Sequence, residues 1–146
     1  MACSRRALWL LAICGGLAHA ANTPPPISAT QAWVRWLPGN LPAGGYLTLR
    51  NDGDRPATLV SVSSPDFALV SLHRSTLSNA VSTMQPVPQI VLPPHQSLSF
   101  AAGGYHIMLE QATRPLKPGD HVSITLHLSD GSSLDVSLEL RRPDAG

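Results

Sequence analysis

Two histidines and two methionines stand out in the sequence because their donor atoms suit one kind of metal. His106 and Met108 lie two residues apart in the stretch GGYHIMLE, and His73 and Met84 precede them. Thioether sulfur selects soft Cu(I) over hard cations such as Ca²⁺ or Mg²⁺, whereas imidazole binds copper in either oxidation state. The four residues therefore form a candidate Cu(I) site, provided that the fold brings them together.

Strand periodicity places the later pair of these residues away from the expected core. Successive side chains of a β-strand point to opposite faces, so Ile107 and Leu109 share one face with Tyr105, and His106 shares the other with Met108. The inward set is complete without the histidine and the methionine. We therefore expect both on the solvent side of the strand.

The earlier pair is expected in a similar position. Leu72 and Val70 are the natural core residues of LVSLH, which puts His73 on the other face with Ser71, and Met84 is expected in the polar loop VSTMQPVP. Each residue alone has an ordinary explanation, as a surface histidine or a methionine that covers a loop. Solvent-side methionines are nevertheless unusual, because thioethers normally fill cores, and the group of four favours a metal site.

The elements that must position these residues are short strands. Alternation with a period of two recurs along the chain, and no long stretch keeps a helical period without proline or glycine, which indicates an all-β sandwich or barrel with one domain. The expected strand segments are 43–51, 57–64, 67–73, 90–100, 103–110, 120–131 and 132–140.

The register of the last two strands follows from their apolar residues. These residues have even numbers in both strands. If both sets face the core, the residue numbers of each cross-strand pair must add up to an even number. The loop must then contain an odd number of residues, for example Asp130-Gly131-Ser132. This register puts His127 on the solvent side. His95 and His121 are expected in turns.

The first twenty residues are expected to be a secretory signal peptide. Arg5 and Arg6 form a basic region, residues 7–17 an apolar region too short to span a bilayer, and Ala18-His19-Ala20 a cleavage site. We expect cleavage after Ala20, with residues 21–146 forming the mature domain. Lipid attachment at Cys14 is the alternative.

Removal of this leader narrows the possible chemistry. Both cysteines of the chain, Cys3 and Cys14, leave with it, which excludes thiolate metal ligands, blue-copper electron transfer and thiol-disulfide exchange. Ten Lys and Arg become eight against nine Asp and Glu, so the formal charge falls from +1 to about −1. The scattered cations predict no binding to nucleic acid.

The sequence resembles the PCu(A)C-type periplasmic copper chaperones of bacteria. That family's motif is a His, ten residues, a Met, twenty-one residues and then His-Xaa-Met, and His73, Met84, His106 and Met108 match all four positions. The segments AWVRWLPG, GGYLTLRNDGD and PGDHVSITLHLSDG are also similar to the family pattern. The resemblance extends from about residue 27 to residue 140.

The resemblance implies a cupredoxin-like Greek-key fold that binds one Cu(I) ion through the four matched residues. It also implies transfer of the ion to a recipient protein, typically the CuA centre of a haem-copper oxidase, with another copper chaperone as a further candidate partner. We expect a periplasmic monomer with no membrane span. The chain ends in LELRRPDAG and lacks the His- and Met-rich tail with which some members bind a second copper ion.

Other functions remain open at the level of the sequence. The main alternative is a copper-buffering or resistance protein with the same ligands and no dedicated recipient. A copper oxygenase needs a histidine as its first mature residue, which only cleavage after Ala18 would provide by exposing His19. A Ser-His-Asp hydrolase lacks support because no Gly-Xaa-Ser-Xaa-Gly motif occurs. We therefore expect a binding protein rather than an enzyme.

Overall fold

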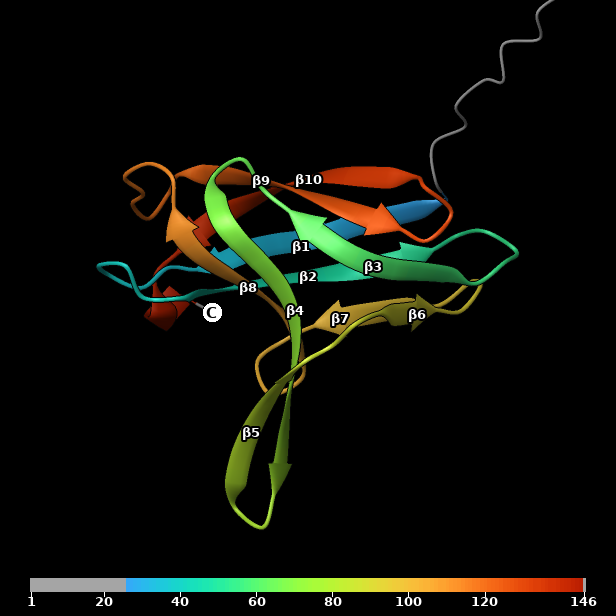
Figure 1. Cartoon of the computed structure of the whole chain (residues 1–146), viewed down its shortest axis with the longest axis horizontal. Helices are drawn as coiled ribbons and strands as arrows, with labels where there is room; N and C mark the ends of the chain where they lie inside the picture. The colour runs from blue at the N-terminus through green and yellow to red at the C-terminus, as the bar shows by residue number, and fades with distance from the viewer. Residues whose placement is uncertain (1–25, 146) are drawn as a thin grey trace, which may run out of the picture.

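The computed structural model describes residues 26–145, which form a curled sheet of ten strands (Figure 1). The expected signal peptide lies outside these residues. The strands are β1 (Ile27–Arg35), β2 (Ala43–Asn51), β3 (Ala57–Ser63), β4 (Phe67–Ser78), β5 (Val81–Pro86), β6 (Ile90–Leu92), β7 (Ser97–Phe100), β8 (Tyr105–Ala112), β9 (His121–Leu128) and β10 (Ser133–Arg141), followed by the 3₁₀ turn η1 (Pro143–Ala145).

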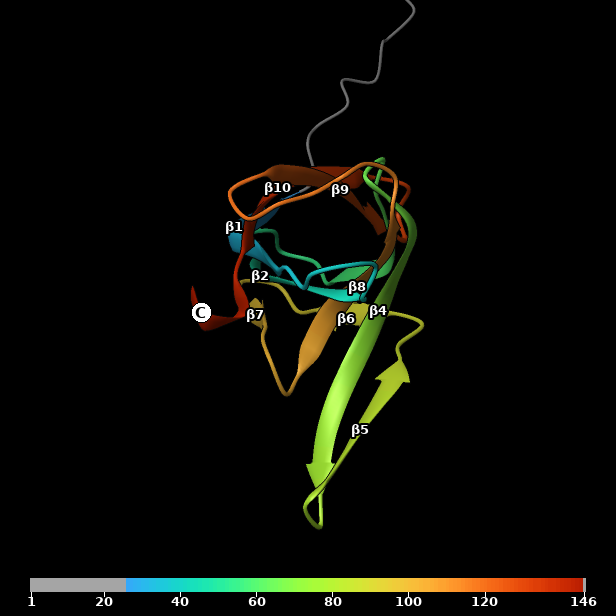
Figure 2. The same cartoon turned by 90° about the vertical axis from the view of Figure 1, so that its left-hand side faces the viewer.

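The strand order confirms the expected all-β, cupredoxin-like architecture. The sheet runs β5-β4-β8-β2-β1-β10-β9-β3-β6, with β7 paired to β2. The pair of β1 and β10 is parallel, whereas the other pairs are antiparallel. Seen end-on in Figure 2, the strands curl around the core, so that β9 and β10 lie across from β2 and β8. No helix among residues 26–145 is long and apolar enough to cross a membrane.

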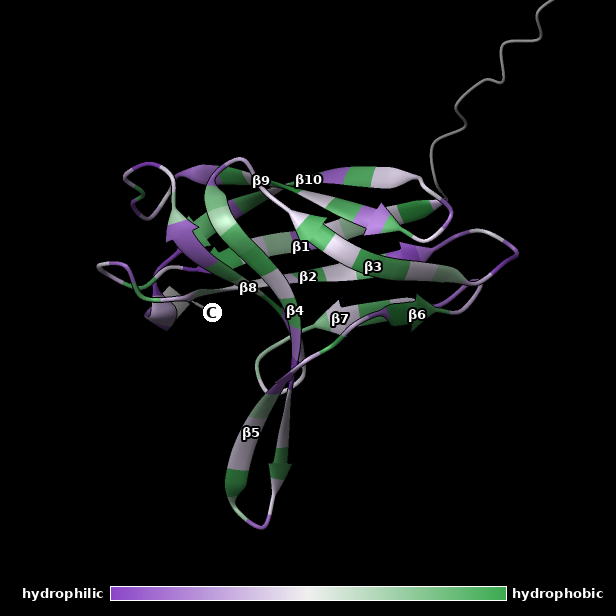
Figure 3. Ribbon diagram, viewed as in Figure 1, coloured by the Kyte–Doolittle hydropathy of each residue, from purple (hydrophilic) through white to green (hydrophobic). Residues whose placement is uncertain are grey.

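We call the curled sheet without the projecting part of β4 and β5 the barrel. Alternating apolar side chains form its core. Figure 3 shows the alternation along the strands. The register of β9 and β10 is the expected one: Leu126 pairs with Leu134 and Ile124 with Val136, which directs both apolar sets inward. The most deeply buried apolar side chains are Val34, Leu47, Ile107, Leu109, Val122, Ile124, Leu126, Leu138 and Leu140.

Several local expectations were wrong. Strand β1 was not foreseen, because its apolar alternation is interrupted by the polar pair Thr30-Gln31 and by a register shift between Thr30 and Trp33. The segment 90–100 is two strands, β6 and β7, separated by a turn in which His95 has a φ of 58°. His121 begins β9 instead of lying in a turn, and its partner in β10 is Glu139.

Strands β4 and β5 form a hairpin that projects from the barrel (Figures 1 and 2). Strand β4 continues past His73 to Ser78, the turn consists of Asn79 and Ala80, and β5 returns antiparallel to β4. All residues of β5 are exposed. Met84 therefore lies on an edge strand, and its expected place in a polar loop was wrong.

Candidate metal centre

The two candidate histidines face each other across neighbouring strands. His73 of β4 is the direct cross-strand partner of His106 of β8, and their ring centroids are 5.8 Å apart. The adjacent pair, Leu72 and Ile107, is buried in the core. Because side chains alternate along a strand, both imidazoles project from the face opposite the core.

The register places both methionines on the same face as the histidines. Met108 pairs with Ser71 of β4, and Met84 of β5 pairs with Ser75 of β4. The side chains of residues 71, 73 and 75 of β4 project from the same face of the sheet, and the side chains of their direct cross-strand partners project from that face too. His106 Nε2 lies 3.0 Å from Met84 Sδ. The structure thus brings the four candidate residues to one face of β5, β4 and β8.

The four side chains differ in their exposure to solvent. Met84 is 51% exposed, His73 and Met108 are half-buried, and His106 is only 8% exposed. His106 thus lies on the expected face, opposite the core, but it is buried rather than open to solvent, because the β4–β5 hairpin brings Met84 against its ring. The site has one side on the barrel and one side on the projecting hairpin.

In each imidazole, one ring nitrogen makes a hydrogen bond that orients the ring, and the other ring nitrogen is available to bind a metal. His106 Nδ1 donates to the carbonyl oxygen of Gly104 at 3.2 Å, and Nε2 of the same ring faces Met84 Sδ at 3.0 Å. His73 Nε2 lies 2.9 Å from the hydroxyl oxygen of Ser71. Within residues 26–145, His73 Nδ1 is buried and has no hydrogen-bond partner.

The surroundings of His73 favour its neutral form. Burial lowers the pKa of this imidazole, the neighbouring His106 lowers the pKa further, and the Glu110 carboxylate opposes the shift, with a net pKa below the ordinary 6.5. A neutral imidazole keeps the lone pair that a metal requires. His73 is therefore prepared to act as a ligand at neutral pH.

The donor set suits a soft ion. In the described part of the chain, no group of three or more His, Cys, Asp or Glu side chains is placed to hold a metal. The donors that the structure gathers on this face are two imidazoles and two thioethers. Neutral thioethers and imidazoles match Cu(I) and do not provide the oxygen ligands that Ca²⁺ or Mg²⁺ requires.

The remaining described histidines have other contacts. His95 Nε2 lies 2.8 Å from a carboxylate oxygen of Asp54, and His127 Nε2 lies 2.8 Å from the hydroxyl oxygen of Ser63. The backbone carbonyl of His121 accepts a hydrogen bond from Arg114. None of these contacts includes a residue of the candidate metal centre.

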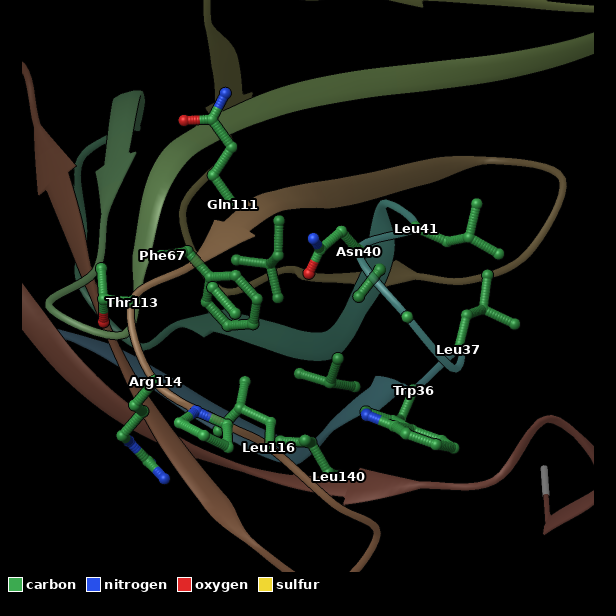
Figure 4. Close-up of a pocket in the computed structure, with 16 residues that line it drawn as sticks. Trp36, Leu37, Asn40, Leu41, Phe67, Gln111, Thr113, Arg114, Leu116 and Leu140 are labelled. Carbon is green, nitrogen blue, oxygen red and sulfur yellow. The ribbon is translucent and has the colours of Figure 1, made fainter.

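A cavity of about 450 Å³ lies beside the carboxyl end of β8 (Figure 4), and none of the four candidate ligands lines it. Trp36, Phe67 and Leu116 contribute apolar surface, while Asn40 and Gln111 are among its polar residues. The cavity contains no histidine or methionine. It is therefore separate from the metal centre.

The comparison with protein families agrees with the fold and the motif. Residues 27–140 match the model of the LpqE-like family, whose description is "Putative lipoprotein LpqE-like". The chain belongs to the LpqE-like family. This LpqE-like protein is 30% identical over 140 residues to the "Putative lipoprotein Lxx21020" of Leifsonia xyli subsp. xyli (strain CTCB07), with 90% of this chain and 84% of the relative aligned.

Solved structures confirm the resemblance of the LpqE-like protein to the PCu(A)C type. The copper-bound PCuAC domain from PmoF2 superimposes with a TM-score of 0.68 at 26% identity, covering 83% of this chain and 97% of that domain. The solution structure of CuI-DR1885 from Deinococcus radiodurans gives a TM-score of 0.63 at 32% identity, covering 86% of this chain and 84% of that chain. Both related structures are described as copper forms.

Proposed function

We propose that this LpqE-like protein is an exported metallochaperone that binds one Cu(I) ion through His73, Met84, His106 and Met108. The observation that carries the proposal is the 3.0 Å approach of His106 Nε2 to Met84 Sδ, on the same sheet face as His73 and Met108. The copper-bound relatives support the identity of the ion. The ion is cargo, which the protein holds and passes on.

The exposure of the site supports transfer rather than storage. A recipient can approach Met84, which is 51% exposed on the projecting hairpin, without disturbing the core. Following the family resemblance, we propose the CuA centre of a haem-copper oxidase as recipient, with another copper chaperone as a further partner. Copper buffering without a dedicated recipient is the second candidate, because the same four ligands would also hold the ion in a buffering protein. Direct transfer from the copper-loaded protein to an isolated CuA domain distinguishes the two.

Binding rather than catalysis is the proposed activity. All four donors on this face are assigned to holding the ion, and residues 26–145 contain no cysteine that would serve as a nucleophile. The proposed location is the periplasm, with the leader cleaved after Ala20, and the lipoprotein description of the family supports export. Mass spectrometry of the mature protein distinguishes this cleavage from lipid attachment at Cys14.

An anaerobic titration tests the proposed site. The mature protein should take one equivalent of Cu(I) from a competing Cu(I) chelator and should hold Zn²⁺ far more weakly, because two of the four donors are thioethers. Replacement of any one of the four residues should weaken Cu(I) binding. His95→Gln is the control, because His95 contacts Asp54 outside the site. Tight Zn²⁺ binding without Cu(I) binding would overturn the proposal.

A further inference from the structure

Tyr46 is a buried aromatic residue on the same sheet face as the candidate ligands. Leu47 and Leu49 of β2 point into the core, so Tyr46 and Gly44 project from the opposite face. Although this face lies away from the core, Tyr46 is only 8% exposed. Trp33 of β1 packs against it, with ring centroids 5.0 Å apart. The phenol ring is therefore held in place from the β1 side.

The phenol of Tyr46 lies over Gly44, the β2 residue that faces Met108. A Cβ atom added to Gly44 would lie 3.2 Å from Cζ of Tyr46 and 2.8 Å from its hydroxyl oxygen, and the second distance is shorter than Cβ atoms show in proteins. Gly44 is the cross-strand partner of Met108 on β8 and of Arg35 on β1. The end of the phenol thus occupies the space that a side chain at position 44 would fill beside Met108.

We propose that Tyr46 is a positioning residue that holds the Met108 thioether toward His106. Methionine has three rotatable side-chain bonds and adapts to whatever surrounds it. On this face, Met108 has Ser71 as its neighbour on β4 and Gly44 as its neighbour on β2. Without the phenol, the missing side chain at Gly44 leaves a space into which the thioether can turn away from His106.

Gly44 and Tyr46 act together to orient Met108, and this role rests on the proposed Cu(I) site. Contacts between sulfur and an aromatic ring are favourable, and a ligand held in its binding geometry before the ion arrives loses less freedom on binding. Gly44 permits the arrangement, because any larger residue would displace the phenol. Tyr46 therefore sets the orientation of the ligand on the barrel side, whereas Met84 stays exposed on the hairpin.

Nuclear magnetic resonance of the copper-free protein with labelled methionine methyl groups tests this arrangement without any metal. We expect a nuclear Overhauser effect between the Tyr46 ring protons and the Met108 methyl group. Tyr46→Leu and Gly44→Ala should each move the Met108 methyl signal toward that of a freely rotating methionine and leave Met84 unchanged. Thr48→Val, two residues further along the same face of β2, is the control and should change neither signal.

A double-mutant cycle of Tyr46 and Met108 tests whether this arrangement contributes to Cu(I) affinity. Tyr46→Leu should weaken Cu(I) binding about two- to tenfold in the natural sequence and should have no further effect on a Met108→Leu background. Absence of the Overhauser effect, or an equal loss on both backgrounds, would overturn the role of Tyr46. If the natural protein binds no Cu(I), the proposed function fails, while the Overhauser effect still decides whether Tyr46 orients Met108.

Discussion

At the scale of single residues, the two imidazoles of the candidate site are oriented by neighbours that do not bind metal. One ring nitrogen of His106 contacts the Gly104 carbonyl, and one ring nitrogen of His73 contacts the Ser71 hydroxyl. These contacts leave the other nitrogen of each ring for a metal. Among residues 26–145, Met84 Sδ contacts another candidate ligand, His106 Nε2, so the positions of the two sulfur atoms depend on packing and on the site itself.

Replacing Met108 by leucine tests whether its sulfur binds copper. Leucine nearly conserves the volume, so the stability of the copper-free protein should change by less than about 1.5 kcal/mol. Loss of the sulfur donor should lower Cu(I) affinity and reduce the rise in melting temperature that Cu(I) causes, because ligands stabilise the state that binds them. Chelator competition and thermal denaturation of the same samples measure both effects.

The control for this variant lies on the other face of β8. Ile107 is fully buried, so Ile107→Ala should lower the free energy of unfolding by roughly 2 to 5 kcal/mol through loss of core contacts. Its folded fraction should still bind Cu(I). Unchanged Cu(I) affinity in the Met108→Leu protein would contradict the assignment of Met108 as a ligand.

At the scale of elements, the alternation of apolar residues was sufficient to predict most strands and the site face of β8. Strand β5 was missed because all its residues are exposed, so it carries no alternating apolar signal. The turn before it also lacks the Asn-Gly pair that marks many two-residue hairpins. The burial of His106 and Tyr46 was not predictable either, because it depends on side chains from β5 and β1 that are distant in the sequence.

The hairpin turn stores strain at Ala80. Asn79 and Ala80 have φ values of 49° and 61°, and the flanking residues Ser78 and Val81 are paired, as in a type I′ turn. Alanine disfavours this region, whereas glycine adopts it readily, so Ala80→Gly should stabilise the hairpin by up to about 1 kcal/mol. Slower amide hydrogen exchange in β5 would show this local effect.

The matched control uses a glycine that already has this conformation. Gly131, between β9 and β10, has a φ of 86°, and an added Cβ would meet nothing within 4 Å, so Gly131→Ala changes only the backbone preference. This variant should be less stable than the natural protein. Faster exchange in β5 of the Ala80→Gly protein would show that the turn is not strained at Ala80.

At the scale of the whole molecule, Asp66 joins three segments of the barrel. It lies between β3 and β4, accepts the Ser123 backbone N–H of β9 at 2.9 Å, and pairs with Arg114 at 2.8 Å. Burial raises the pKa of this carboxyl group, but the Ser123 hydrogen bond and Arg114 outweigh burial, and the net pKa is lowered below the ordinary 3.8. The ionised form therefore stabilises the fold.

Acid should remove this stabilisation. A carboxyl group with a lowered folded-state pKa contributes fully above its unfolded pKa, and the contribution disappears as the pH falls through the folded value. The free energy of unfolding of the natural protein should therefore fall below about pH 4. Asp66→Asn should cost about 1–3 kcal/mol at neutral pH and should weaken this acid dependence. Urea denaturation across the pH range measures both, and an undiminished dependence in the variant would contradict the role of Asp66.

The difference in exposure between Met108 on the barrel and Met84 on the hairpin predicts how oxidation affects the copper-free protein. Met84 is 51% exposed and Met108 is half-buried, so mild peroxide should convert Met84 to its sulfoxide first. Sulfoxide formation removes the soft sulfur donor, and Cu(I) affinity should fall at this first step. The far-ultraviolet dichroism should stay unchanged, because neither methionine belongs to the buried core. Mass spectrometry of peptides identifies the order, and full Cu(I) affinity after both methionines have gained oxygen would show that the site uses other atoms.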